Sequence, residues 1–250
     1  MRQVSEVTVG LMTTFCAFVL GRIWDWLRQA IVFRRARRFW RPFVSGELQV
    51  VIGRHTDFAA FEPTGFIGVG SALALKELLA HFDDLRFRRF KVAYNDHVEG
   101  DSLKTNLILL GGPDANSITR LVLERVPLTF RAGDPGIHEV SIHDQRTGAV
   151  FSPRLTSNSL GQAQVKTDYG LLVKAPNPFQ QGSHVLIIAG SFGYGTWAGV
   201  RLAQDETFLR QKGVSSGPVE CIYETDVAED APQQVRLVLV RPLRDASMTS

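Results

Sequence analysis

Three glycine-rich turns stand directly before segments with helical spacing in this 250-residue chain. Their sequences are GFIGVGSA at 65–72, GGPDANS at 111–117 and GSFGYGTWAG at 190–199. Glycine lets the backbone adopt a positive φ and come close to a ligand. The helix N-terminus that follows offers unpaired N–H groups and a partial positive charge. This combination predicts that the turns bind phosphate or another anion.

The second turn contains more special residues than a simple corner needs. Asp114, Asn116 or Ser117 could cap the following helix, and capping needs only one of them. It needs neither of the adjacent glycines, Gly111 and Gly112. We therefore expect a ligand to approach this backbone, with Gly111, Gly112, Asp114 and Asn116 as contacts. The alternative is a tight corner between a strand and a helix.

The third turn matches the GxGxxA pattern of dinucleotide-binding loops. That pattern expects an acidic residue about twenty positions later, whereas Asp205 and Glu206 come too early. The alternative interpretation is that these glycines only allow a tight turn between a strand and a helix. If the turn binds a nucleotide, its aromatic side chains would stack on the ligand, and the predicted contacts are Gly193, Tyr194, Gly195, Thr196 and Trp197.

Catalytic machinery is much less evident in the sequence. The segment NDHVEGD at 95–101 could supply metal ligands or a general base, although a solvated polar loop explains it more simply. The chain has no GxSxG, GxxxxGK[ST] or HExxH motif, and we predict no metal site. Cleavage of an N-glycosidic bond in NAD or a nucleoside would need one carboxylate, for which Asp114 and Glu99 are the weak candidates.

The net charge of +3 conceals a local cluster of arginines. Seven arginines lie between Arg22 and Arg41 and are opposed there only by Asp25, so this segment carries +6 and the rest −3. The pattern predicts a local basic patch and argues against a broad nucleic-acid surface, so we expect no nucleic-acid partner. The two cysteines, Cys16 and Cys221, form no CxxC motif, which makes a structural zinc site improbable.

The N-terminus has three interpretations. Residues 7–21 carry no charge, and Trp24, Trp26 and the arginine block follow them. As a helix they would span roughly 22 Å, short of the ~30 Å hydrocarbon core. We favour a membrane anchor over residues 1–41 that contacts lipid through its helix and its arginines. The positive-inside rule then predicts a single-pass inner-membrane protein with a cytoplasmic C-terminal domain. A cleaved signal peptide and a buried or partner-binding helix are the alternatives.

The elements that must position these turns follow an α/β pattern. Strands are predicted at 47–53, 90–94, 106–110 and 184–190, and amphipathic helices follow most of them. We expect a Rossmann-like, mostly parallel sheet over residues 42–250, with a β-rich insertion at about 128–168. Ligands of such sheets bind at the carboxyl ends of the strands. Asn177 follows a predicted strand at 169–175 and is expected at that edge as a further ligand contact.

The segment LILLGGPDANS resembles a recurring loop of Rossmann-like domains in prokaryotic membrane-tethered and signalling proteins, in which a strand ends in Gly-Gly-Pro-x-x-Asn before a helix. Weaker similarity extends to DYGLLVKAPNPF and VLIIAGSFGYGTWAG. The resemblance points to no named family. It implies a nucleotide-type ligand and leaves the reaction open.

These observations favour a membrane-anchored cytosolic sensor or effector of bacterial signalling or defence. Its Rossmann-like domain would bind a nucleotide or dinucleotide such as NAD, and the chain could form a homo-oligomer. The first alternative is an enzyme that cleaves NAD or a nucleotide at the N-glycosidic bond. The second is a protein-interaction module whose glycine turns are only corners.

Overall fold

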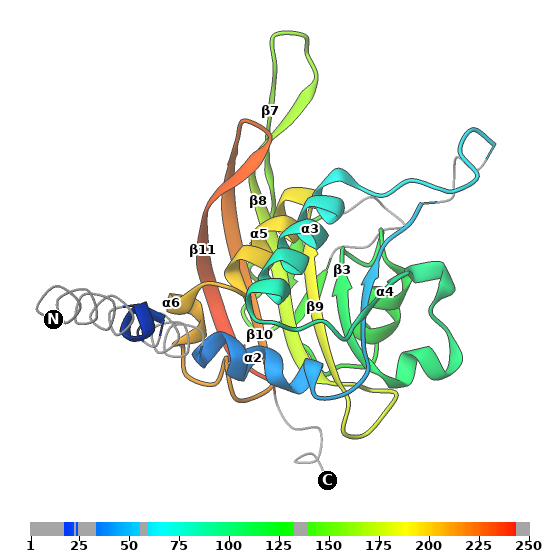
Figure 1. The fold of residues 1–250 in the computed structure, drawn as a ribbon. Coiled ribbons are helices and arrows are strands. Elements are labelled where there is room, and N and C mark those ends of the chain that lie inside the picture. The colour runs from blue at the N-terminus through cyan, green and yellow to red at the C-terminus, as the bar shows by residue number, and fades with distance from the viewer. Residues whose placement is uncertain (1–17, 23, 25–33, 56–59, 133–139, 244–250) are drawn as a thin grey trace, which may run out of the picture.

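One eight-stranded sheet forms the centre of the molecule (Figure 1). The computed structural model describes residues 18–22, 24, 34–55, 60–132 and 140–243. The strand order is β11-β10-β8-β9-β3-β1-β2, and β7 pairs with β8 beside this path. The strands are β1 (Leu48–Ile52), β2 (Lys91–Tyr94), β3 (Asn106–Leu110), β7 (Arg154–Ser157), β8 (Ala163–Pro176), β9 (His184–Gly190), β10 (Val219–Ala228) and β11 (Ala231–Pro242).

The sheet is mixed, so the predicted mostly parallel, Rossmann-like sheet is wrong. Strands β2, β1, β3 and β9 pair in parallel, which makes three parallel pairings. The four pairings that involve β7, β8, β10 and β11 are all antiparallel. Only residues 177–183 connect β8 to β9. A parallel connection needs a crossover of a dozen or more residues, so this short loop forces the two strands to run in opposite directions.

Two hairpins extend the antiparallel half. Strands β10 and β11 are joined at Glu229 and Asp230, whose φ angles are 51° and 54°. Two successive positive φ angles are typical of the tight turns that match the twist of a hairpin. The β7–β8 hairpin extends beyond the helices at the same end of the molecule as the β10–β11 turn (Figure 1).

Helices cover one face of the sheet, and a helix with a small second sheet covers the other. The first face packs against α2 (Arg34–Val44), α3 (Val69–Asp84), α5 (Gly193–Leu202) and α6 (Glu206–Leu209). The second packs against α4 (Ser117–Leu123) and a sheet of β4 (Phe130–Ala132), β5 (Ile142–Asp144) and β6 (Val150–Phe151). Strand β3 shows why both faces are apolar, because Ile108 and Leu110 enter one core while Leu107 and Leu109 enter the other.

The predicted membrane anchor is not supported. Among the described residues, no helix has the length and apolar character needed to cross a membrane. Most of the apolar segment at 7–21 lies outside the described residues. Most of the arginine block that we expected to contact lipid forms α2, whose side chains Phe39, Trp40 and Phe43 are fully buried against the sheet. Helix α2 crosses the domain boundary expected at residues 41/42, and the described residues do not support the predicted single-pass inner-membrane localisation.

Candidate functional site

The three glycine-rich turns, far apart in the sequence, meet at the carboxyl ends of β1, β3 and β9. A Cβ atom on Gly70 would overlap the carbonyl of Gly193, so the first turns of α3 and α5 touch through bare backbone. A Cβ on Gly112 would lie 3.4 Å from the carbonyl oxygen of Gly190. The fold therefore gathers the predicted anion-binding turns at one edge of the sheet.

At this edge the chain leaves two adjacent strands toward opposite faces of the sheet. Helix α3 follows β1 on one face, whereas α4 follows β3 on the other. Such a change of face normally opens a crevice between the strands. Here Asn116 closes it, because Asn116 Nδ2 donates to the carbonyl oxygens of Val51 at 3.2 Å and Leu110 at 3.1 Å. A side chain of the GGPDANS turn thus joins the ends of β1 and β3.

The GGPDANS turn satisfies most of its own polar groups. Asn116 Oδ1 accepts from the N–H groups of Ile118 and Thr119, so this side chain is the cap of α4. Thr119 Oγ1 donates to the Gly111 carbonyl, and the Arg120 guanidinium donates twice to the Pro113 carbonyl. Gly111 has a φ of 105° and lies beside β9, where its N–H donates to Ile188. These contacts give both glycines and Asn116 a structural role beside the predicted ligand role.

A buried aspartate occupies the N-terminus of α5. The Asp168 carboxylate accepts hydrogen bonds from the N–H groups of Tyr169 at 2.9 Å, Phe192 at 3.1 Å and Gly195 at 2.5 Å. Its side chain is fully buried, and this burial raises the pKa of Asp168 to about 6 although the three N–H donors oppose the rise. The position at which a GxGxxA loop would hold phosphate therefore already contains an anion from β8.

The remaining residues of the third turn contact protein groups. Thr196 Oγ1 accepts from the Gly190 N–H at 3.0 Å, and the Gly195 carbonyl accepts from Tyr223. Trp197 Nε1 donates to Glu77 of α3, and the Tyr194 hydroxyl donates to Asp230 at 3.3 Å. Tyr194 also lines a separate cavity of about 280 Å³ between the β7–β8 and β10–β11 hairpins.

The N-terminus of α3 differs from those of α4 and α5 because no side chain caps it. Gly68 occupies the cap position, and the helix continues for 16 residues. Ser71 in its first turn is only 7% exposed, and its hydroxyl has no hydrogen-bond partner among the described residues. That oxygen lies 3.7 Å from the Cβ position of Gly111, so it faces the second glycine turn.

A polar cluster joins the ends of β1 and β2 beside these turns. Arg54 pairs with Asp96, lies 3.2 Å from His97 Nε2 and stacks over the Tyr94 ring at 4.8 Å. Asn95 links this cluster to the second turn, because its Nδ2 donates to Ser117 at 3.3 Å. Partial burial raises the pKa of Asp96, but the hydrogen bonds and charge of Arg54 lower it overall.

The acidic candidates do not assemble into a metal centre. Among the described residues no group of three His, Cys, Asp or Glu side chains could hold a metal ion. Glu99 and Asp114 are exposed, and Asp101 pairs with Lys104 at 2.8 Å. These contacts do not test the weak catalytic roles considered for Asp114 and Glu99.

Asn177 lies at the other edge of the sheet from the glycine turns. Because β8 is antiparallel to β9, the end of β8 at Pro176 pairs with His184 at the start of β9. The Asn177 side chain donates to the carbonyls of Leu103 at 2.8 Å and Thr105 at 2.7 Å. It therefore closes a loop, distant from the junction of the glycine turns.

Sequence reasoning missed three residues that shape this edge. Ser71 was visible as the serine directly after the GxG of the first turn, a position that we assigned no role. Asp168 stands directly before an apolar strand, where a lone acid could have suggested a cap for a neighbouring helix. Arg54 carried no local signal, because its partners Asp96 and His97 lie directly after β2, about forty residues later.

Comparison of the chain with protein-family models, curated proteins and solved structures finds no match. No relative therefore supports the expected nucleotide-binding and signalling roles. Any function must be argued from the residues themselves.

Proposed function

We propose that the protein binds a small phosphorylated ligand at the junction of the three glycine turns, with the phosphate at the N-terminus of α3. The observation that carries this proposal is the unpartnered Ser71 hydroxyl in the first turn of an uncapped, 16-residue helix. The N-termini of α4 and α5 already have acceptors in Asn116 and Asp168. Of these three helices, α3 is the one whose first N–H groups have no side-chain acceptor.

The chemistry of this position favours an anion over a cation or an apolar group. Backbone N–H groups and a helix N-terminus favour negative charge, and a serine hydroxyl adds one further donor. Gly68 leaves the cap position of α3 open, because the nearest atom to its Cβ position is the Ser71 hydroxyl oxygen at 4.0 Å, whereas Gly70 packs against Gly193. Arg54 lies on the same edge beside the second turn, where Asp96 pairs with its guanidinium group.

Thermal stabilisation of the full chain tests the proposal. Inorganic phosphate, ATP and NAD are each added at millimolar concentration to protein freed of bound molecules by extensive dialysis. A ligand present at about 100 times its Kd stabilises the fold by about 2.7 kcal/mol. We expect at least one phosphorylated probe to raise the melting temperature, and release of nicotinamide in the NAD arm would additionally reveal turnover.

Two substitutions at one position separate binding from stability. Ser71→Ala removes the hydroxyl, and we expect about tenfold weaker binding, the equivalent of roughly 1.4 kcal/mol for one hydrogen bond to a charged group. Ser71→Asp places a carboxylate at the N-terminus of α3, and it should abolish binding while the free protein remains folded. Ser215→Ala removes a hydroxyl that contacts Leu209 near α6 and serves as the matched control. Undiminished binding by Ser71→Asp, or no stabilisation by any probe, would refute the proposal.

A further inference from the structure

Helix α2 presents arginines on the side opposite its core contacts. Its residues Arg34, Arg37, Arg38 and Arg41 are exposed, whereas Phe39, Trp40 and Phe43 are buried. The helix contains no acidic residue. Within the described part of the chain, its one ion pair joins Arg35 to Glu206 at 3.3 Å, which leaves the other four arginines without a carboxylate partner.

The arrangement of these arginines opposes helix formation. Positions 34 and 37, 34 and 38, 37 and 41, and 38 and 41 are three or four residues apart, so like charges are neighbours on the helix surface. Such pairs destabilise a helix, and an anion bound across them would remove the repulsion. Core packing explains the aromatic side of α2, but nothing in the core requires arginine on the other side.

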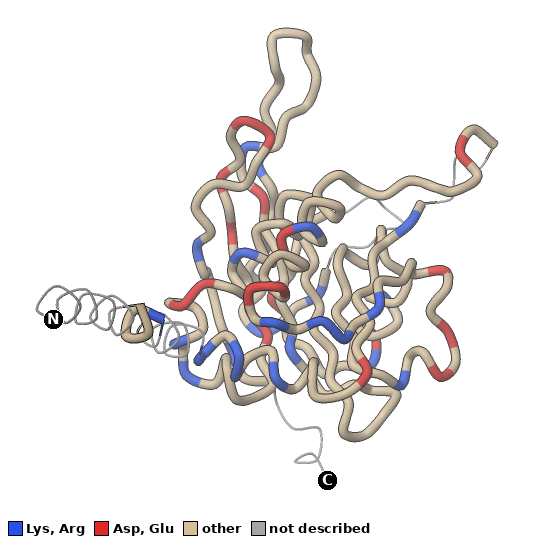
Figure 2. Tube along the Cα trace, viewed as in Figure 1, with Lys and Arg blue, Asp and Glu red and all other residues tan. Residues whose placement is uncertain are grey.

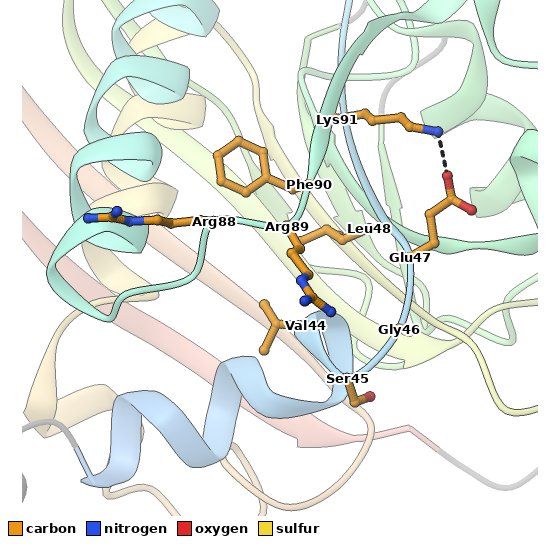
Figure 3. A pocket seen from close by; sticks show the side chains of 9 residues that line it. All are labelled: Val44, Ser45, Gly46, Glu47, Leu48, Arg88, Arg89, Phe90 and Lys91. Carbon is orange, nitrogen blue, oxygen red and sulfur yellow. Dashed lines mark hydrogen bonds and ion pairs between the residues drawn. The ribbon is translucent and has the colours of Figure 1, made fainter.

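A second basic cluster lies beside the end of α2. Arg88, Arg89 and Lys91 precede or begin β2, and with Val44 and Ser45 they line a cavity of about 450 Å³ (Figure 3). Lys91 pairs with Glu47 at 2.7 Å, and Arg88 pairs with Asp83 at 3.5 Å. Arg89 has no carboxylate partner among the described residues, and its guanidinium points toward Val44 (Figure 3).

These five unpaired cations form what we call the basic face, which comprises Arg34, Arg37, Arg38, Arg41 and Arg89. Figure 2 shows lysines and arginines along α2, at the opposite end of the molecule from the projecting hairpins. The basic face lies at the amino ends of β1 and β2, away from the glycine turns at their carboxyl ends. It is therefore distinct from the site proposed for a phosphorylated ligand.

We propose that the basic face binds the phosphate backbone of nucleic acid. The four exposed arginines lie on a helix that contains no acidic residue, and such a row of positive charge suits a polyanion. All five cations are arginines, whose planar guanidinium groups contact phosphate oxygens in pairs. The aromatic residues Phe39, Trp40 and Phe43 are buried and cannot stack on bases, so recognition rests on phosphates and is independent of sequence. The composition alone argued against such a partner, but the fold adds Arg89 to the charges of α2.

Binding of the full chain to a fluorescein-labelled oligothymidylate of about 20 nucleotides tests the proposal by anisotropy. Five phosphate contacts predict that log K falls with log salt concentration with a slope of about −3.5. The variant Arg37→Ala, Arg38→Ala, Arg41→Ala should bind about 100-fold more weakly at 0.1 M salt, because it loses three contacts. Arg89→Ala alone should reduce affinity by about fivefold under the same conditions.

A charge-matched variant keeps the experiment specific. Arg131→Ala, Arg146→Ala, Lys166→Ala removes three exposed cations from β4, a turn and β8, and it should retain most of the affinity. Equal losses in the two triple variants would show that binding follows net charge alone, which overturns the assignment to this face. Absence of salt-dependent binding, or equally tight binding of labelled poly-glutamate, would overturn the assignment to nucleic acid. Circular dichroism of each variant verifies that it is folded.

Discussion

Replacing Asp168 by asparagine should stabilise the protein at neutral pH, although Asp168 accepts three hydrogen bonds. Burial raises the pKa of Asp168 from an ordinary value of 3.8 to about 6. Because its folded-state pKa exceeds its unfolded-state pKa, the protonated acid favours the fold, and stability falls as the pH rises from about 4 to 6. The difference between the two pKa values lowers the free energy of unfolding by about 3 kcal/mol at pH 7. The partial positive charge at the N-terminus of α5 stabilises the carboxylate by about 0.3–1 kcal/mol, which leaves a net destabilisation of the fold of about 2 kcal/mol.

The assay is urea unfolding of both proteins at several pH values between 4 and 7. Near pH 4 the protonated acid and the carboxamide each offer the surrounding N–H groups one carbonyl oxygen, so their stabilities should be similar. At pH 7 we expect Asp168→Asn to exceed the natural protein by about 2 kcal/mol. Taking the difference between the two stability curves cancels the titration of the ionisable groups that both proteins share. A variant that is less stable than the natural protein at pH 7 would show that the three N–H donors outweigh desolvation, and would refute the reasoning.

Two further predictions concern buried charges elsewhere in the fold. Burial lowers the pKa of Lys174 from 10.5 to about 8, so the charged side chain destabilises the fold below pH 8 and this penalty disappears as the pH rises toward 10.5. Lys174→Met should therefore raise the free energy of unfolding by up to about 3 kcal/mol at pH 7, reduced by the loss of the hydrogen bond to the Val214 carbonyl. Urea unfolding at pH 7 and at pH 10 checks that this gain shrinks at the higher pH. Arg241 and Asp144 form a buried pair at 2.6 and 2.7 Å that attaches the small sheet to β11. Asp144→Ala should lower the free energy of unfolding by about 3–5 kcal/mol because it leaves the Arg241 charge unpaired. Replacing both residues by leucine should lower it much less. Guanidinium unfolding measures both variants, and similar losses in the two would contradict this account.

Several elements of the fold were predictable because their signals are local. The continuous apolar runs at 106–110 and 184–190 form β3 and β9 with those bounds, since strands buried on both faces need apolar residues at every position. The cap of α4 was narrowed to three nearby residues, and Asn116 is the one that accepts from N–H groups two and three residues away. The segment after the third glycine turn does not form one continuous helix. The segment divides into α5 and α6 at Asp205, whose side chain caps α6.

The direction of β8 was misjudged although the sequence contained the relevant fact. Its apolar residues suit a parallel or an antiparallel strand equally well, and we gave more weight to the α/β pattern around it. The seven residues at 177–183 are too few for a crossover. This one direction decides that Asn177 lies at the edge opposite the glycine turns, and that Asp168 lies beside Phe192 and Gly195.

By itself the sequence indicated where the buried strands and the glycine turns occur, because these depend on residues a few positions apart. It also determined that the three glycine turns can come close to another backbone. Only the tertiary structure decided which donors at those turns are already used, because the acceptors come from strands distant in the chain. It also decided that the aromatic side of α2 docks on the sheet and that Arg89 lines a cavity beside the last residue of α2. Strand order and direction set these contacts, and no local pattern of residues encodes either one.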